Sequence, residues 1–362
     1  LTWGRPQWFP QWEAEHRATR EGVIVMDMSF MAKYRVEGRD AGRMLERISA
    51  NRVAEEAGRI TYTQWLNEGG TLEADLTVTK LDDDRFWVVA SDTAHRHALT
   101  WMRRNIPEDA HAHVTDVTSG FAQLNVQGPR SRALLQSLTS VDLSNEAFPF
   151  RTARMIDIGF ARLMCVRITY LGELGYELYI PTEHAAHVYD RIVAAGEPLG
   201  LRHAGLKALA SLRMEKGYRD YGHDIDNTDS VLEAGLGFAV AFDKPGGFIG
   251  REAALAKKFE GKRNGGFSRR LLQVMLLDPD PLMYHGEIVH RDGKPVGYIR
   301  AASYGHTLGG AVGLAMIEGG GAPVTKTWIE AGSWEVDVAG KKVPAKLSIR
   351  PLYDPKMERV KS

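Results

Sequence analysis

The sequence predicts an α+β fold, with two α+β subdomains followed by a small C-terminal β-barrel or sandwich. From residue 34 onward, short strand-like runs alternate with helical runs, and strands come as neighbouring pairs followed by a helix. After residue 269 the chain turns into short strands separated by Gly and Pro turns, up to residue 349. Paired strands followed by helices favour antiparallel α+β layers over a doubly wound parallel sheet.

The first subdomain follows from hydrophobic spacing. Residues 34–36 form a short strand-like run, and Met44, Leu45 and Ile48 then recur at helical spacing, which predicts a helix over 41–48. Residues 75–81 and 85–90 are rich in β-branched and aromatic residues around an acidic turn, which predicts a two-stranded hairpin. A helix is predicted to follow over residues 95–104.

The same pattern recurs in the second subdomain. Strands are predicted over 162–170 and 176–180, on either side of a Gly-rich turn, with a helix over 184–195. Glycines concentrate within residues 257–269, which we interpret as a linker. The opening residues are rich in Trp and Pro without a clear period. The predicted organisation is an extended segment (1–12), the two α+β subdomains (13–260) and the barrel domain (267–362).

Composition narrows the class of protein. A chain of 362 residues suggests two or three packed domains, and 46 basic residues against 46 acidic ones leave no excess charge for nucleic acid. No apolar run approaches the roughly 20 residues of a membrane helix. The single cysteine, Cys165, lies in an apolar run, which indicates a core residue and fits a reducing compartment, the cytoplasm or, in a eukaryote, the mitochondrial matrix. The chain opens at Leu1 without a methionine, as a trimmed start, a segment of a longer polypeptide or a processed subunit would.

Several cofactor sites find no support in the motifs. The histidine pairs at 95/97 and 111/113 lack a third ligand at suitable spacing, so no metal site is predicted. Glycines at 235 and 237 lack the third glycine of a dinucleotide-binding loop, and no helix is expected after the run 318–321. We therefore expect no flavin or nicotinamide site in this chain. No context for a Ser-His-Asp triad or an activated cysteine stands out either.

Three charged residues stand out from the pattern alone. Asp75 begins a predicted strand after a Gly-Gly turn, where a ligand can approach the backbone closely, although an ordinary turn-exit Asp fits as well. Glu73 could share its face. Glu177 lies on the strand face opposite Tyr176 and Leu178, either as a ligand-binding carboxylate or as a solvent-facing one.

A fourth residue, Arg213, ends an otherwise apolar helical stripe. Leu206, Leu209 and Ala210 precede it at helical spacing, so a charged group is expected at the end of a buried face. A buried charge needs a partner. The alternatives are a structural ion pair, a side chain that reaches out to solvent, or contact with a ligand.

Several motifs in a fixed order carry a family resemblance. Residues 67–78 (Asn-Glu-Gly-Gly-Thr-Leu-Glu-Ala-Asp-Leu-Thr-Val), 170–177 (Tyr-Leu-Gly-Glu-Leu-Gly-Tyr-Glu), 212–218 (Leu-Arg-Met-Glu-Lys-Gly-Tyr), 221–225 (Tyr-Gly-His-Asp-Ile) and 232–236 (Leu-Glu-Ala-Gly-Leu) resemble segments of the glycine-cleavage T-protein, or aminomethyltransferase, family. The segments 3–9, 27–34 and 351–355 look like the carboxyl-terminal, folate-binding halves of dimethylglycine and sarcosine dehydrogenases. The resemblance extends from Trp3 to Pro355.

The resemblance implies a fold and an activity. It implies two α+β, ferredoxin-like subdomains and a β-barrel around a central channel for tetrahydrofolate. It further implies transfer of the methyl-derived carbon of an N-methylated amine, as an iminium or formaldehyde, to give 5,10-methylenetetrahydrofolate. In the dehydrogenases a separate flavin domain oxidises the amine, so a flavin-containing domain or subunit is the expected partner.

The resemblance also assigns roles to residues. Asp75 matches the catalytic Asp, which steers a proton and stabilises the cationic iminium. Glu177 matches the carboxylate that accepts the pterin 2-amino and N3–H hydrogens. Tyr62, Tyr170 and Tyr221 are candidates to pack on the pterin or aminobenzoyl rings, with ordinary core packing as the alternative. For Arg213 the ligand contact would include the glutamate tail of folate.

Two other functions remain open at this level. One is a free-standing folate-dependent demethylase that takes a methyl group directly from an amine, sulfonium or aryl ether. The other is a non-catalytic folate-binding subunit of a flavin amine dehydrogenase, which the presence of Asp75 and Glu177 argues against.

Overall fold

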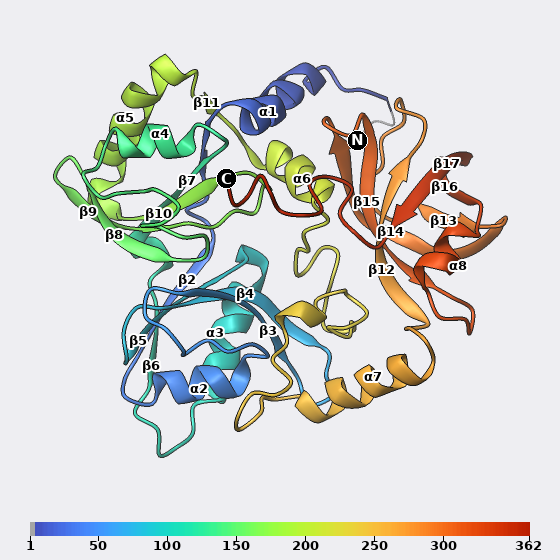
Figure 1. The fold of residues 1–362 in the computed structure, drawn as a ribbon, viewed down its shortest axis with the longest axis horizontal. Coiled ribbons are helices and arrows are strands. Elements are labelled where there is room, and N and C mark those ends of the chain that lie inside the picture. Colours follow the sequence, from blue (N-terminus) through green and yellow to red (C-terminus); the bar gives the residue numbers. More distant parts are fainter. Residues whose placement is uncertain (1–3) are drawn as a thin grey trace.

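A computed structural model describes residues 4–362 and arranges them as three lobes around a common centre (Figure 1). The first lobe is a six-stranded sheet in the order β11-β1-β7-β10-β9-β8, in which only the β1–β11 pair is parallel. Its strands are β1 (Ile24–Asp27), β7 (Phe121–Gln127), β8 (Ala153–Ile158), β9 (Ala161–Val166), β10 (Gly175–Pro181) and β11 (Arg202–His203). The helices α4 (Ser131–Gln136) and α5 (Ala185–Gly196) bury leucine, valine and isoleucine side chains against one face of this sheet.

The second lobe is a five-stranded antiparallel sheet in the order β3-β4-β5-β2-β6. Its strands are β2 (Ala32–Glu37), β3 (Ile60–Leu66), β4 (Leu72–Lys80), β5 (Arg85–Ala90) and β6 (His113–Asp116). Its helices are α2 (Ala41–Ile48) and α3 (His95–Arg104), which cover one face with Met44, Leu45, Ile48 and Met102. The chain enters the first sheet through β1 before it builds the second, which ties the two lobes together.

The third lobe is a closed six-stranded barrel in the order β12-β15-β14-β13-β16-β17. It comprises β12 (Arg269–Leu276), β13 (Ile288–Arg291), β14 (Lys294–Gly305), β15 (Gly310–Glu318), β16 (Trp334–Val338) and β17 (Lys341–Ser348), with the short helix α8 (Lys326–Glu330) between β15 and β16. Closure leaves the barrel without free strand edges.

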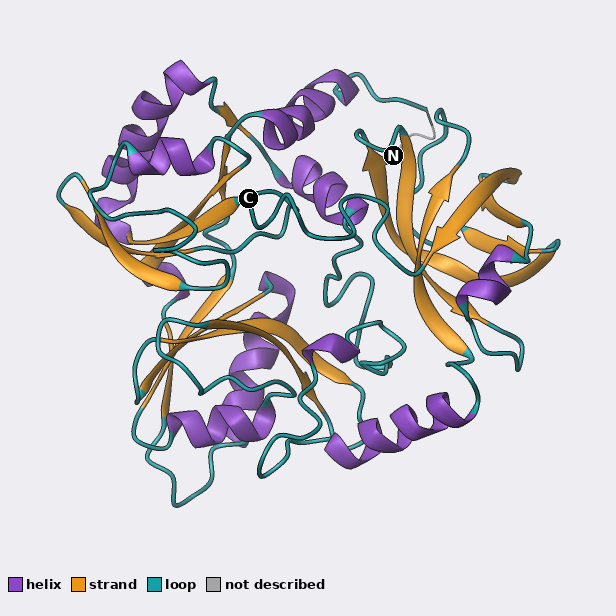
Figure 2. Ribbon diagram, in the orientation of Figure 1, coloured by secondary structure: helices purple, strands orange, loops and turns teal. Residues whose placement is uncertain are grey.

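Three helices join the lobes: α1 (Phe9–Glu21), α6 (Leu206–Glu215) and α7 (Arg251–Arg263). Helix α6 packs against both α1 and β14, so it lies between the first lobe and the barrel (Figure 1). Between α6 and α7 the chain forms a long stretch of turns through the centre of the molecule (Figure 2), interrupted by one short 3₁₀ helix, η5 (Gly237–Ala239). The other 3₁₀ helices, of the same length, are η1 (Asp92–Ala94), η2 (Thr118–Gly120), η3 (Thr182–His184) and η4 (Glu197–Leu199).

The predicted fold class is confirmed: two α+β lobes precede a C-terminal barrel, and almost all strand pairs are antiparallel. Some boundaries were wrong. The segment expected to be extended over 1–12 enters α1 at Phe9, and residues 1–3 lie outside the described part. Much of the predicted linker 257–269 belongs to α7, because the run from Arg251 is rich in Ala, Glu and Lys, which are good helix formers. The strand expected over 162–170 ends at Val166.

The apolar stripe predicted on the 206–215 helix is also wrong. Leu206 is 56% exposed, whereas Ala208, Ser211 and Leu212 are buried. The second half of α6 is enclosed by α1 on one side and the barrel on the other, so burial there follows neighbours that are distant in sequence. Among residues 4–362, no helix combines the length and the apolar composition that crossing a membrane requires.

Candidate functional site

The two sheets meet through a small apolar cluster that defines a shared interior. Ile60 on β3 and Trp87 on β5 pack with Val166 on β9 and Tyr179 on β10. Because strand residues alternate between faces, positions two apart from these share the same interior side. Glu177 lies two positions before Tyr179 on β10. On β4, Thr79 pairs with Ile60 and Trp87, and Asp75 lies four positions before Thr79, so both carboxylates lie on the sheet faces that meet.

Asp75 lies in the middle of β4 rather than at its first residue, since the strand begins at Leu72. Gln64, directly opposite on β3, donates a hydrogen bond from Nε2 to Asp75 Oδ1 at 2.8 Å, and the Tyr62 hydroxyl also interacts with the carboxylate. Burial raises the pKa of Asp75 to about 7, against the hydrogen bonds from Gln64 and Tyr62, while the charge of Asp220 adds to the rise. The side chain is nevertheless partly accessible, so it lines an internal space instead of lying in a packed core.

Glu73 is engaged elsewhere. It accepts a hydrogen bond from Asn67 Nδ2 at 3.0 Å, and its Oε2 lies 2.8 Å from His97 Nε2. With both oxygens occupied, Glu73 is a poor alternative to Asp75.

Tyr62 offers a test of how the Asp75 carboxyl is tuned. Its hydroxyl interaction lowers the pKa of Asp75, and its ring stacks on Phe238 with centroids 6.2 Å apart. Tyr62→Phe keeps the ring but removes the hydroxyl. We expect the Asp75 pKa to rise further, because the variant loses a hydrogen bond that favours the ionised carboxyl. Titration of the Asp75 carboxyl by NMR in parent and variant checks this, and an unchanged titration would show that the hydroxyl does not influence Asp75.

Glu177 lies in a polar cluster on the inner face of the first sheet. Tyr179 donates a hydrogen bond from its hydroxyl to Glu177 Oε2 at 2.7 Å, and the side-chain amides of Gln123 and Asn125 donate at 3.3 and 3.5 Å. Burial raises the pKa of Glu177 to about 7, and the hydrogen bonds from Tyr179 and Asn125 and the charge of Lys33 oppose the rise. Its neighbours Tyr176 and Leu178 point the other way, into the core under α4 and α5.

Lys33 completes the charges around Glu177. Its ammonium group donates to the backbone carbonyls of Ser29 and Met31 at 2.9 and 2.7 Å. Burial lowers its pKa to about 8, although the charges of Asp27 and Glu177 support the cation. An anionic Glu177 therefore has a nearby positive charge without a direct ion pair.

Arg213 is buried and has a protein partner. Its Nη1 donates to Asp224 Oδ1 at 2.7 Å and to the Tyr218 carbonyl at 3.0 Å, and Asp220 lies 3.9 Å from Nη2. Burial disfavours the guanidinium charge, but these acidic neighbours hold its pKa above the usual range. Of the alternatives weighed for Arg213, the structural ion pair is the one with an observed partner, and a folate contact stays a prediction.

Of the other two tyrosines, Tyr170 lies in the turn between β9 and β10, and Tyr221 lies in the long stretch of turns after α6. Tyr170 donates a hydrogen bond to the Arg219 carbonyl at 2.6 Å and stacks on Tyr218, with centroids 6.0 Å apart. Tyr221 packs at the edge of the cluster that also contains Tyr62, and its carbonyl accepts from Thr93. All three predicted tyrosines thus border the interior between the lobes, and none is fully buried.

Sequence reasoning missed the amides beside the carboxylates. Gln64 supports Asp75, while Gln123 and Asn125 support Glu177. A signal was present in the strand 121–127, where Gln123, Asn125 and Gln127 alternate with apolar residues although the strand is buried in the middle of a sheet. Amides on the inner face of a central strand indicate a polar interior.

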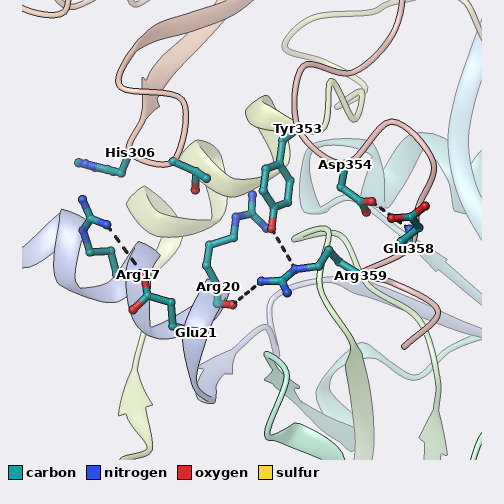
Figure 3. A pocket seen from close by; sticks show the side chains of 9 residues that line it. Arg17, Arg20, Glu21, His306, Tyr353, Asp354, Glu358 and Arg359 are labelled. Carbon is teal, nitrogen blue, oxygen red and sulfur yellow. Dashed lines mark hydrogen bonds and ion pairs between the residues drawn. The ribbon is translucent and has the colours of Figure 1, made fainter.

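A pocket of about 540 Å³ lies elsewhere, where α1, the β14–β15 turn and the C-terminal tail meet (Figure 3). Arg20, His306, Tyr353 and Arg359 contribute to its wall. None of the residues predicted for the folate site lines it, so it is separate from the Asp75 and Glu177 region.

Two family models match the chain. The GCVT N-terminal domain matches residues 1–244, and the glycine cleavage T-protein C-terminal barrel domain matches residues 269–354. The chain therefore belongs to the glycine cleavage T-protein family. This is a family of folate-dependent aminomethyltransferases, in which some relatives oxidise methylated amines.

Individual relatives agree with the family. The chain is 41% identical over 360 residues to 4-methylaminobutanoate oxidase (formaldehyde-forming) of Paenarthrobacter nicotinovorans, covering 99% of this chain and 42% of that protein. It is 32% identical over 359 residues to the mitochondrial sarcosine dehydrogenase of Homo sapiens, covering 95% and 38%. The chain thus spans about two fifths of these relatives. The crystal structure of glycine cleavage system aminomethyltransferase T from Bartonella henselae superimposes with a TM-score of 0.82 at 23% identity, covering 95% and 90%.

Proposed function

We propose that this chain transfers a one-carbon unit from the oxidation product of an N-methylated amino acid to tetrahydrofolate, yielding 5,10-methylenetetrahydrofolate. The observation that carries the proposal is the pair of partly accessible carboxylates, Asp75 and Glu177, on facing sheets, both with pKa values raised to about 7. Strongly perturbed pKa values of this kind concentrate at functional sites. The donor is an iminium or formaldehyde, and relatives named for 4-methylaminobutanoate and sarcosine support an amino-acid amine.

The polar groups beside both carboxylates fit a reduced pterin. Gln123 Oε1 and Gln64 Oε1 are buried acceptors without a hydrogen-bond partner among the described residues. A pterin offers a 2-amino group and an N3–H that Glu177 and Gln123 would accept, which would leave its reactive nitrogens toward Asp75. Tyr62, Tyr170 and Tyr221 would flank its rings, and a contact of Arg213 with the glutamate tail would be indirect, through the loop that contains Asp224.

Bound tetrahydrofolate supplies the nucleophilic nitrogens that accept the carbon. Asp75 has two tasks. In its ionised form it stabilises the positive charge of the iminium, and because its pKa lies near neutrality it exchanges a proton with the departing amine at little cost. With an iminium donor, two carbon–nitrogen bonds to tetrahydrofolate would replace the carbon–nitrogen double bond of the donor. The two folate nitrogens would each give up a proton, Asp75 would pass these protons to the departing amine, and the amine would leave as an ammonium ion, so that atoms and charge balance. The surrounding lobes keep water away from the iminium, which would otherwise hydrolyse to formaldehyde.

A flavin-containing oxidase or dehydrogenase domain or subunit is the partner we propose for the preceding oxidation. The chain spans only part of relatives named as an oxidase and a dehydrogenase, and the remainder of each is available for that step. A free-standing demethylase would need no such partner. Methyl transfer from an N-methyl amino acid by the purified chain alone, without a flavoprotein, would favour that second function.

Glu177→Gln tests the pterin site. The substitution preserves shape but replaces an acceptor oxygen by an amide, so we expect calorimetric titration to show tetrahydrofolate affinity reduced by about 10- to 100-fold, the cost of a lost charge-assisted hydrogen bond. Glu183→Gln, an exposed carboxylate just beyond the same strand, is the matched control and should bind like the parent chain. Equal affinity of both variants would remove Glu177 from the site.

A further inference from the structure

Arg219 is an enclosed guanidinium without a carboxylate partner. Its Nε donates to the Ala234 carbonyl at 2.9 Å and its Nη1 to the Gly217 carbonyl, and no ion pair to Arg219 exists among residues 4–362. Two other arginines with little exposure behave differently, since Arg213 binds Asp224 at 2.7 Å and Arg300 binds Asp229 at 2.6 Å. A charge in a protein interior ordinarily has such a partner, so Arg219 needs an explanation.

The guanidinium is held rigidly with donors left over. Two of its nitrogens are anchored to backbone carbonyls, and the Tyr170 hydroxyl fixes its own carbonyl at 2.6 Å. Nη2 lies against Gly235, where a Cβ atom would approach to 2.6 Å, and Gly235 adopts a positive φ of 75°. Nη2 makes no hydrogen bond within the described residues and is not a buried atom either. Its N–H groups therefore face the accessible interior.

This interior is the one that Asp75 lines. Tyr62, whose hydroxyl interacts with Asp75, packs against the cluster that contains Ala234, and the Ala234 carbonyl accepts from Arg219. The charges of Asp224 and Asp75 also act on Arg219, and Arg219 in turn acts on Asp75. Burial nevertheless lowers the pKa of Arg219. A second guanidinium, Arg270, repels it, and the Arg270 side chain has no hydrogen bond or ion pair within residues 4–362. Two cations without a direct ion pair beside the proposed one-carbon site are therefore available to an anionic group of a ligand.

We propose that Arg219 binds a carboxylate of the ligand held at Asp75. The inference rests on the proposed function. With an amino-acid donor, Asp75 would face the cationic nitrogen and Arg219 the acid group, so that the site recognises a zwitterion at both ends. The glutamate of tetrahydrofolate carries the same chemistry. A planar, fixed guanidinium suits either carboxylate, because two parallel N–H groups match its two oxygens.

Two ligand pairs distinguish the sources, measured by calorimetric titration of the full chain. The first pair is 4-aminobutanoate and n-butylamine, which differ in the carboxylate. The second pair is tetrahydrofolate and tetrahydropteroyl amide, in which a neutral amide replaces the glutamate and its carboxylates. For Arg219→Gln we expect the carboxylated member of one pair to bind at least about 10-fold more weakly, with the other member unchanged. Arg85→Gln, at an exposed arginine that begins β5, is the control and should alter none of the four affinities.

The four affinities show which carboxylate, if any, Arg219 binds. Weaker 4-aminobutanoate binding identifies the donor carboxylate, and weaker tetrahydrofolate binding identifies the glutamate. Unchanged affinity for all four ligands, or equal weakening of all four, would overturn the assignment, because the second result is what a purely structural arginine produces. If the parent chain binds no tetrahydrofolate, the proposed function fails, whereas the 4-aminobutanoate and n-butylamine pair still tests Arg219.

Discussion

Replacing Asp75 with Asn should lower the rate of one-carbon transfer to tetrahydrofolate by about 10²- to 10⁴-fold, the usual contribution of a positioned acid–base group. The amide retains the size of the carboxyl and a hydrogen bond to Gln64, so tetrahydrofolate binding should change little. It can neither exchange a proton nor carry the negative charge that stabilises an iminium. Measurement of single-turnover transfer beside calorimetric binding separates the two effects.

The pH dependence sharpens this prediction. In the parent chain, transfer that requires ionised Asp75 should rise with pH through about 7 and then level off, and Asp75→Asn should lose this limb. Glu73→Gln is the control, since its carboxylate is occupied by Asn67 and His97. Transfer by Asp75→Asn at the parent rate would refute the catalytic role.

The same pKa shift predicts a change in stability. The folded chain holds a proton on Asp75 between its ordinary pKa and about 7, and the unfolded chain does not, so this contribution to the free energy of unfolding is complete at low pH and disappears as pH rises through about 7. Asp75→Asn carries no buried charge. It should therefore be more stable than the parent chain at pH 8, on the order of 1–2 kcal/mol, and not at pH 4. Residues that serve function often lower the stability of the folded state.

The sequence predicts those structural features that depend on residues close together in the chain, and it fails for features that depend on contacts between distant segments. Alternation along β10 places Glu177 opposite Tyr176 and Leu178, because strand periodicity is local. The burial of α6 is set instead by α1 and β14, which lie far away in the chain. Leu206 is exposed for this reason, despite its position in an apolar spacing.

Around the site, too, local features follow from the sequence and long-range contacts do not. The spacing that marked Arg213 as unusual is local, but its partner Asp224 lies in an irregular loop whose path no periodicity describes. Gln64 meets Asp75 only because β3 and β4 pair in one register. Arg219 is unusual because none of the described residues forms an ion pair with it. That fact becomes visible only when the positions of all its neighbours in three dimensions are known.

The largest stability effect should come from Glu215, at the end of α6. Its Oε2 lies 2.9 Å from Arg20 Nη2 and 3.4 Å from His16 Nε2, and its Oε1 accepts from the backbone nitrogens of Thr307 and Leu308. Arg20 also contacts Glu173 and lies under the Tyr353 ring, 4.0 Å from its centroid, beside the pocket in Figure 3. One carboxylate thus links α1, α6 and the barrel.

Glu215→Ala should lower the free energy of unfolding at pH 7 by about 3–5 kcal/mol, because it removes one partner of a buried ion pair and leaves the charge of Arg20 undercompensated. Burial would raise the pKa of Glu215, but His16 and Arg20 reverse this and hold it at about 2. Its contribution is therefore present above the unfolded pKa of a glutamate and lost as pH falls toward 2, so the difference between parent and variant should be smaller at pH 3 than at pH 7. Urea unfolding at pH 7 and pH 3 measures this.

Glu21→Ala, at an exposed carboxylate on α1, is the control, and its free energy of unfolding should stay within about 0.5 kcal/mol of the parent value. A loss for Glu215→Ala no larger than for this control would show that the lobes do not depend on Glu215 to hold them together.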